Sequence, residues 1–208
     1  MKVKLTKIDG LSINYHSNLD NQDKCFFIWE YNVEQDCVPG NTKSLILNLK
    51  KSPLRKGRPE WRYKGEAISQ CAKVLKAILP AVALSEYTFV PVPPSKAKDH
   101  AEYDDRLTQI ITSIGGVEDV DVRDIVVQNQ TTVPFHEPGS IRLSVDELVD
   151  LYSIDETVIG DLEPKKIIIF DDILTNGTHF KAMKMVLSER FPNAKIVGVF
   201  LARVPPRQ

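Results

Sequence analysis

The sequence has few cysteines, no long hydrophobic run and no apolar leader. Its three cysteines, Cys25, Cys37 and Cys71, are odd in number and widely spaced, without a CxxC pair. This pattern predicts neither a disulfide framework nor a zinc site, and it favours buried free thiols. No apolar run approaches the roughly 20 residues that a membrane-spanning helix requires. Since the first residues also lack the apolar segment of a secretory signal, we expect a cytoplasmic protein that does not span a membrane.

An excess of charge of either sign is also missing. The 27 Lys and Arg residues nearly balance the 28 Asp and Glu residues, so the formal net charge is −1 at pH 7. Because nucleic-acid backbones are bound mainly by an excess of basic groups, the overall charge does not indicate strong nucleic-acid binding. Hydrophobic residues make up 42% of the 208 residues, which is enough to bury a full core and a small additional unit.

Strand and helix patterns alternate from about residue 60 onward. Apolar residues at helical spacing, or caps, predict helices over residues 66–79, from Arg106 to Gly115-Gly116, from Ser144 (with Glu147 as a capping box) and from residue 178. Branched and aromatic runs predict strands over residues 87–92, 122–127, 167–170 and 195–204. This order predicts a doubly wound α/β fold with a mainly parallel sheet.

The first 60 residues contain no motif that we can assign. Segments rich in branched and aromatic residues, separated by Asn, Asp and Gly turns, predict strands over residues 2–8, 25–31 and 44–49. We expect these strands to form a small antiparallel appendage of residues 1–60, next to a core of residues 61–208.

One segment near the C-terminus combines a strand, two carboxylates and a glycine turn. Residues 167–179 are IIIFDDILTNGTH, and the unbroken apolar run is typical of a strand covered on both faces. Asp171 and Asp172 can accept hydrogen bonds from vicinal hydroxyls. Gly177 allows close backbone approach where the next helix begins, and a helix start is a natural phosphate site. The segment therefore predicts a site for a ribose with a 5-phosphate.

The same segment resembles the phosphoribosyl pyrophosphate (PRPP) signature of type I phosphoribosyltransferases. In that signature, four apolar residues, two acids, two apolar residues and a Thr-x-Gly-x-Thr/Ser turn follow one another. The resemblance implies the type I fold and assigns PRPP contacts to Asp171, Asp172, Thr175, Asn176, Gly177, Thr178 and His179. Two positions depart from the usual form, because Asn176 replaces a frequent Thr or Ala and His179 stands where Thr or Ser is usual.

A second resemblance lies at the end of the predicted strand 87–92. The sequence FVPVPPSK, residues 89–96, is similar to the VPVP pyrophosphate loop of competence-associated phosphoribosyltransferase-like proteins. This similarity adds Pro93, Ser95 and Lys96 to the residues expected to contact PRPP. The usual Arg-Gly-Phe-Asn-Gln continuation is absent, and YDDRL with Arg106 stands nearby instead. Together the two segments give Asp171, Asp172, Lys96 and Arg106 as candidate catalytic residues.

Two further regions are expected to complete the site. Residues 128–143 are long, polar and contain Gly and Pro, which is typical of lids or disordered loops. In the family such a loop closes over PRPP, so Gln130, His136 and Arg142 become loop candidates. The family also places a hood over the acceptor, which we expect from residues 1–60. The rings that could stack on an acceptor there, or else pack between hood and core, are Trp29, Tyr31, Trp61 and Tyr63.

The resemblance implies transfer of ribose 5-phosphate from PRPP to a base or amine, with release of pyrophosphate. Mg²⁺ would accompany the diphosphate instead of occupying a protein site. Two alternatives remain open: a non-catalytic PRPP or nucleotide sensor, and an accessory interaction protein on the same scaffold. The family also leads us to expect a homodimer. The sequence identifies neither the acceptor nor the pathway.

Overall fold

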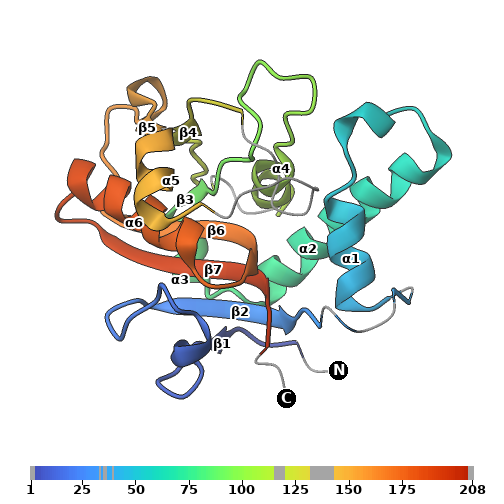
Figure 1. The fold of residues 1–208 in the computed structure, drawn as a ribbon, viewed down its shortest axis with the longest axis horizontal. Helices are drawn as coiled ribbons and strands as arrows, with labels where there is room; N and C mark the ends of the chain where they lie inside the picture. Colours follow the sequence, from blue (N-terminus) through green and yellow to red (C-terminus); the bar gives the residue numbers. More distant parts are fainter. Residues whose placement is uncertain are drawn as a thin grey trace.

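The fold is a mixed α/β arrangement around a mostly parallel sheet (Figure 1). The computed structural model describes residues 3–32, 34, 37–38, 40–114, 120–131 and 143–205. The central sheet has the order β1-β2-β7-β6-β3. Its strands are β1 (Thr6–Lys7), β2 (Cys25–Glu30), β3 (Thr88–Pro91), β6 (Lys166–Leu174) and β7 (Lys195–Arg203). A separate two-stranded sheet pairs β4 (Val126–Gln128) with β5 (Tyr152–Ile154).

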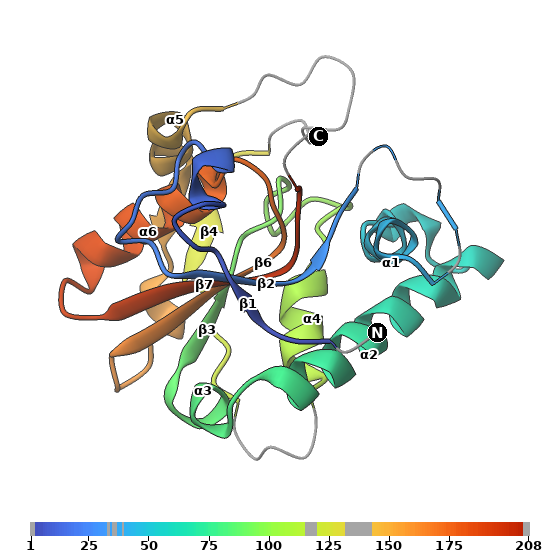
Figure 2. The same cartoon turned by 90° about the horizontal axis from the view of Figure 1, so that it is seen from below.

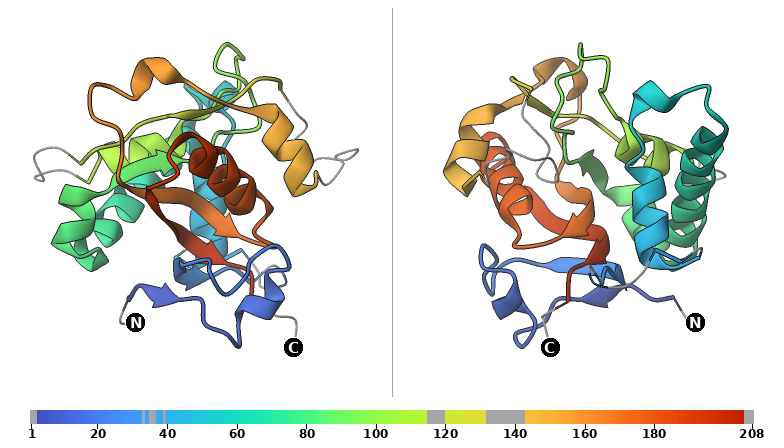
Figure 3. Two further views of the ribbon diagram at one scale, coloured as in Figure 1. Left: turned by 90° about the vertical axis from the view of Figure 1, so that its left-hand side faces the viewer. Right: turned by 45° about the vertical axis from the view of Figure 1, so that its right-hand side comes forward.

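Helices lie on both faces of the central sheet (Figures 2 and 3). The helices are α1 (Thr42–Leu49), α2 (Arg62–Ile78), α3 (Ala81–Glu86), α4 (Arg106–Thr112), α5 (Val145–Leu151) and α6 (Thr178–Arg190). α6 and α5 cover one face, while α4 and α2 lie on the other, with α1 packed beside α2. Because β6 is covered from both sides, Ile167, Ile169 and Phe170 have no exposed surface.

All strand pairs of the central sheet except β1–β2 are parallel. β3 aligns Pro91 with Phe170 of β6, so both strands end at the same edge of the sheet. Carboxyl ends of parallel strands are the usual location of ligand sites in such folds. The register therefore places the residues after β3 and after Phe170 side by side.

The N-terminal predictions are correct only in part. β1 and β2 are antiparallel neighbours as expected, but β2 is also parallel to β7 and belongs to the central sheet. The antiparallel prediction is thus wrong for β2, whose Cys25, Phe27 and Ile28 are buried. The central sheet therefore includes strands from both sides of residue 60, where a boundary between appendage and core was expected.

The predicted strand over residues 44–49 is wrong, because this segment is helix α1. The side chain of Asn41 accepts a hydrogen bond from the backbone N–H of Ser44 (2.8 Å) and caps the helix. Leu45, Ile46 and Leu49 are all buried in this segment, which packs against α2. This is the spacing of a helix, because a strand would turn Ile46 to the face opposite Leu45 and Leu49.

Most of the other predicted elements are confirmed. α2, α4, α6, β3, β6 and β7 lie where expected, and Ser144 and Glu147 form the predicted capping box. The strand predicted over residues 122–127 is divided: Val122 bridges to Phe89, whereas β4 begins only at Val126. Cys25 and Cys71 are buried free thiols as expected, but Cys37 is exposed. In the described ranges, no helix is both long and apolar enough to cross a membrane.

Candidate functional site

The acid pair lies near the carboxyl end of β6, and its two carboxylates have different surroundings. Asp172 is almost fully buried, with a side chain that is 5% exposed. Asp171 is half-buried, and its Oδ1 accepts a hydrogen bond from the backbone N–H of Asp172 (2.7 Å). Alternation along the strand explains the difference, because adjacent side chains point to opposite faces of a sheet.

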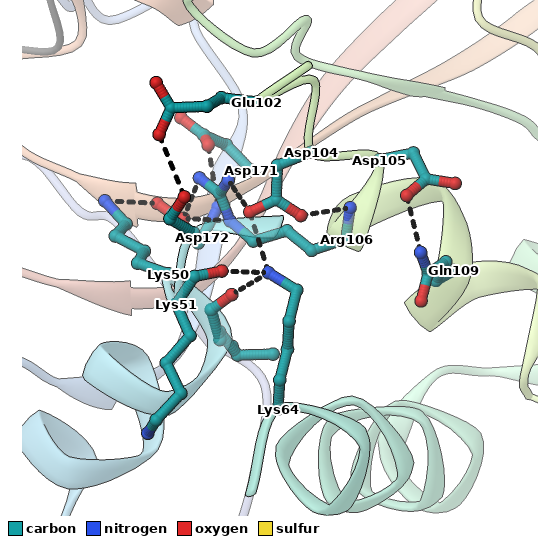
Figure 4. A network of polar contacts seen from close by, with 12 residues as sticks. Lys50, Lys51, Lys64, Glu102, Asp104, Asp105, Arg106, Gln109, Asp171 and Asp172 are labelled. Atoms are coloured by element: carbon teal, nitrogen blue, oxygen red, sulfur yellow. Dashed lines mark hydrogen bonds and ion pairs between the residues drawn. The ribbon is translucent and has the colours of Figure 1, made fainter. Parts of the chain in front are cut away.

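An alternating chain of charges surrounds Asp172 (Figure 4). Lys50 Nζ lies 3.2 Å from Asp172 Oδ1, and Arg106 Nη2 lies 2.8 Å from Asp172 Oδ2. Arg106 Nη1 also donates to Asp104 Oδ2 (3.0 Å), which in turn accepts from Lys64 Nζ (2.8 Å). The Lys64 ammonium is further held by the backbone carbonyls at positions 49 and 51. The network thus links β6, α4 and the connection between α1 and α2.

These charges shift the pKa values of the two acids in opposite directions. Burial opposes ionisation of Asp172, but Lys50 and then Arg106 outweigh it and hold the pKa of Asp172 well below its usual range. For Asp171, burial and the neighbouring Asp172 charge raise the pKa to about 7. Burial opposes the charge of Arg106, yet Asp172 and Asp104 raise the pKa of Arg106 above its ordinary value. At neutral pH, Asp172 is therefore a fixed anion, while Asp171 changes its charge.

The signature turn follows directly after β6 and enters α6. Gly177 has φ +85°, in the left-handed region that a side chain rarely adopts. Leu19 covers this glycine so closely that an added Cβ would lie 2.7 Å from Leu19 Cδ2. Gly177 is therefore required both by its backbone conformation and by its contact with the N-terminal segment.

That N-terminal segment, residues 16–19, also binds the turn through hydrogen bonds. His16 Nδ1 donates to the carbonyl of Thr175, and the backbone N–H of Asn18 donates to the carbonyl of Asn176 (2.9 Å). The amide Nδ2 of Asn18 donates to Thr178 Oγ1 (3.0 Å). We call residues 16–19 the strap, because their contacts hold the carbonyls of the turn on one side.

The strap, which the structure describes in full, accepts no hydrogen bond from the amide groups of the turn. Within the described part of the chain, the backbone N–H groups of Asn176 and Gly177 have no hydrogen-bond acceptor. The N–H of Thr178 makes only a long contact with Asn176 Oδ1 (3.4 Å). Together with the unpaired first N–H groups of α6, these donors form the arrangement that binds anions at helix starts.

His179 is oriented by a tyrosine on β5. The distance between Tyr152 Oη and His179 Nδ1 is 2.7 Å. His179 keeps an exposed surface, yet desolvation by nearby protein groups lowers the pKa of its imidazole to about 4, so the ring is neutral at pH 7. If Tyr152 donates to Nδ1, the remaining ring nitrogen, Nε2, carries the proton and can act as a neutral hydrogen-bond donor.

The predicted diphosphate loop lies beside the acid pair, but its lysine does not reach it. β3 ends at Pro91, and Pro93 and Lys96 line a small cleft with Tyr103 and Asp104. No described hydrogen bond or ion pair joins Lys96 to Asp171 or Asp172. The carbonyl of Ser95 accepts from Gln128 Nε2 (3.0 Å), which fixes the loop to β4.

Other predicted contributors have different locations. His136 and Arg142 lie outside the described residues, whereas the carbonyl of Gln130 accepts from the side chain of Gln128 (2.6 Å). Tyr31 is close enough to the site that burial and the Asp172 charge raise the pKa of its hydroxyl. Trp61 ends the 3-10 turn before α2 and Tyr63 lies in the first turn of α2, where their rings contact Lys64 and Arg62 instead.

Sequence reasoning missed three residues of the site: Lys50, His16 and Asn18. Each lies in the first 60 residues, more than 100 positions before the signature, and each depends on chain topology for its place. Lys50 directly follows α1, the helix that was predicted as a strand.

Among the described residues, no group of three or more His, Cys, Asp or Glu side chains could hold a metal ion. A scan of the chain against models of known protein families gives no match. A search among curated proteins also finds none that is similar to it.

Proposed function

We propose that the protein binds PRPP at the carboxyl ends of β3 and β6 on a scaffold of the type I phosphoribosyltransferase kind. The observation that carries this proposal is the spacing of two complementary groups on one segment. Asp171 of the acid pair can accept hydrogen bonds from ribose hydroxyls, and the turn that begins three residues after Asp172 contains backbone N–H groups without an acceptor that can bind a phosphate. A ribose 5-phosphate has these two functions at its two ends.

The two acids have separate roles in this proposal. Both Asp172 oxygens are already engaged by Lys50 and Arg106, so Asp172 positions these cations at the rim of the site. Asp171 is half-buried and carries the oxygens that accept the ribose hydroxyls. Since Asp172 has fixed the two cations beside it, Arg106 and Lys50 stand where a diphosphate would need positive charge.

The proposed reaction is transfer of the ribose 5-phosphate unit. The bond between ribose carbon 1 and the diphosphate oxygen breaks, and pyrophosphate leaves with the bonding electrons. A lone pair of the acceptor, a base or amine, forms the new bond to carbon 1, and the acceptor then loses a proton. Positioning and electrostatic stabilisation of the cationic ring are the tasks of the protein. Mg²⁺ would enter with the diphosphate, whose oxygens it prefers, and Asp171 is the carboxylate available to its water shell.

The ion pairs of Asp172 favour a second candidate, a PRPP sensor without turnover. A site whose central carboxylate already holds two cations can bind and release an anionic ligand without further chemistry. The sensor and the enzyme share the same binding step, and they differ in whether pyrophosphate is released.

Calorimetric titration with PRPP and Mg²⁺ tests the binding step. We expect saturable binding by the wild-type protein and at least tenfold weaker binding by Asp171→Asn, which loses an anionic acceptor without losing an ion pair. Pyrophosphate release, followed in the same samples with a mixture of bases and amines, separates enzyme from sensor. Equal PRPP affinity in the wild type and the variant would contradict the proposed site.

A further inference from the structure

The connection between α1 and α2 concentrates positive charge in a chain that is otherwise balanced. Of the residues 50–64, seven are Lys or Arg and one, Glu60, is acidic. Lys50 and Lys64 face the ion-pair network. Four others are exposed on the surface of the connection: Arg55, Lys56, Arg58 and Arg62. We call these four residues the basic surface.

The backbone of the connection is fixed, so the basic surface has a defined shape. Two short 3-10 turns, Pro53–Arg55 and Pro59–Trp61, shape the segment. Ser52 Oγ donates to Glu102 Oε1 (2.9 Å) in the loop after β3, and Lys64 holds two backbone carbonyls of the connection. The segment extends from α1 and α2 at the side of the molecule in Figure 1.

Most of this charge is not neutralised by the protein itself. Arg55 makes one exposed contact, 3.6 Å, with Glu60. In the ranges that the structure describes, Lys56 and Arg58 form no ion pair. Repulsion between neighbouring exposed cations destabilises the fold. An anionic partner that binds these cations would relieve that repulsion.

Apolar and aromatic groups lie among these cations. Leu54 is 61% exposed and Tyr63 is 39% exposed. The guanidinium of Arg62 lies 4.8 Å from the centre of the Tyr63 ring and donates to its hydroxyl (2.9 Å). Planar guanidinium and aromatic groups can stack on unpaired bases, whereas a closed duplex offers mainly its phosphates.

We infer that the basic surface binds a single-stranded nucleic acid, through phosphate contacts of Arg55, Lys56, Arg58 and Arg62 and through stacking or apolar contact at Leu54 and Tyr63. Three of the four cations are arginines, whose forked donors match phosphate oxygens. The near-zero net charge of the whole chain does not indicate this local positive charge, because the acidic residues that balance it lie elsewhere. The inference does not depend on the proposed PRPP site.

Fluorescence anisotropy with labelled 12-nucleotide single strands, one of DNA and one of RNA, tests the inference. With about four phosphate contacts, the logarithm of the affinity should fall with the logarithm of salt concentration at a slope near −3. The triple variant Arg55→Ala/Lys56→Ala/Arg58→Ala should bind at least tenfold more weakly, with a slope nearer −1.

A matched control removes three exposed lysines from the opposite edge of the sheet. Lys24, Lys165 and Lys195 precede or begin the parallel strands β2, β6 and β7, so Lys24→Ala/Lys165→Ala/Lys195→Ala changes the net charge equally. We expect its affinity to stay within twofold of the wild type, with both variants equally folded by circular dichroism. Equal weakening in both triples, no binding at 50 mM salt, or tighter binding of a duplex would overturn the inference. Displacement of the oligonucleotide by an equal charge concentration of polyglutamate would also overturn it, because the surface would then serve acidic protein segments.

Discussion

Arg106 and Asp172 are 66 positions apart in the sequence, yet two nitrogens of Arg106 donate to one oxygen of Asp172. Nη2 lies 2.8 Å and Nε lies 3.1 Å from Asp172 Oδ2. The pair joins the first residue of α4 to β6, and Lys50 joins the same carboxylate to the end of α1. The packing of α4, β6 and the end of α1 therefore depends on the buried carboxylate of Asp172.

Replacing Asp172 with Asn should destabilise the fold strongly. The change keeps the shape of the side chain but leaves Lys50 and Arg106 without their shared anion. Removing one partner from a buried ion pair usually costs about 3 kcal/mol or more in the free energy of unfolding. Urea unfolding followed by circular dichroism measures this loss. Glu30→Gln is the control, because Glu30 is 54% exposed and pairs with Arg203 near the surface. A similar loss in both variants would contradict the role of burial.

Asp171 should make stability depend on pH between about 4 and 7. Its folded pKa of about 7 lies above the ordinary value of 3.8, so the folded protein binds this proton more tightly than the unfolded chain. The free energy of unfolding contributed by this group is therefore greatest below pH 4 and falls as the pH rises to about 7. Asp171→Asn should remove this part of the slope and leave the opposite contribution of Asp172. Unfolding curves at half-unit pH steps, with a carboxyl carbon NMR titration of Asp171, measure both effects, and titration near pH 4 would contradict the assignment.

Gly177→Ala should reduce PRPP affinity by at least tenfold. The new methyl group would meet Leu19 at 2.7 Å and impose strain at φ +85°, which disturbs the turn where the phosphate is expected. Gly57→Ala is a matched control, because Gly57 has φ +90° but no atom within 4 Å of the added Cβ. Calorimetry with PRPP and Mg²⁺ should show wild-type affinity in the control. An unchanged affinity in Gly177→Ala would mean that the turn does not contact the ligand.

The strap should control phosphate binding through the donor on His16. His16→Phe fills the same space without donating to Thr175, so we expect ribose 5-phosphate affinity to fall about fivefold, in line with the loss of one hydrogen bond of about 1 kcal/mol. His16→Asn restores a donor and should recover part of the affinity. Both variants lose the imidazole, so a purely structural role would weaken them alike, and equal affinities in the two would exclude the donor as the cause.

The local parts of this fold follow from the sequence, whereas the contacts between distant parts do not. The IIIF run, the Ser144–Glu147 capping box and the helical spacing of Phe180, Met183 and Leu187 are local patterns, and the structure confirms them. The carboxylates and the turn of the candidate site could also be predicted as a local pattern, since one segment contains all of them. The branched residues of α1, in contrast, suggested a strand, and only packing on α2 with the Asn41 cap decides for a helix.

The partners of the signature could not be predicted because they come from the other end of the chain. Nothing in the sequence around Lys50, His16 or Asn18 specifies a contact with residues 172–178. These contacts exist because β2 enters the central sheet beside β7, which brings the N-terminal segment next to the turn. The prediction of a hood from residues 1–60 placed aromatic rings near the site, but it did not place β2 in the central sheet.

The pairing of β2 with β7 also sets an order of events during protein synthesis. Cys25 of β2 aligns with Gly198 of β7, and Glu30 aligns with Arg203. During synthesis β2 therefore cannot pair with β7 until almost the whole described chain has been made. Pairings of such long sequence separation are slow to form, and an unpaired strand edge is exposed meanwhile. Since the strap and Lys50 follow β2 into place, a nascent chain that has already made the signature turn still lacks a finished site. Ligand binding by this protein should therefore begin only after β7 has been synthesised and has paired with β2.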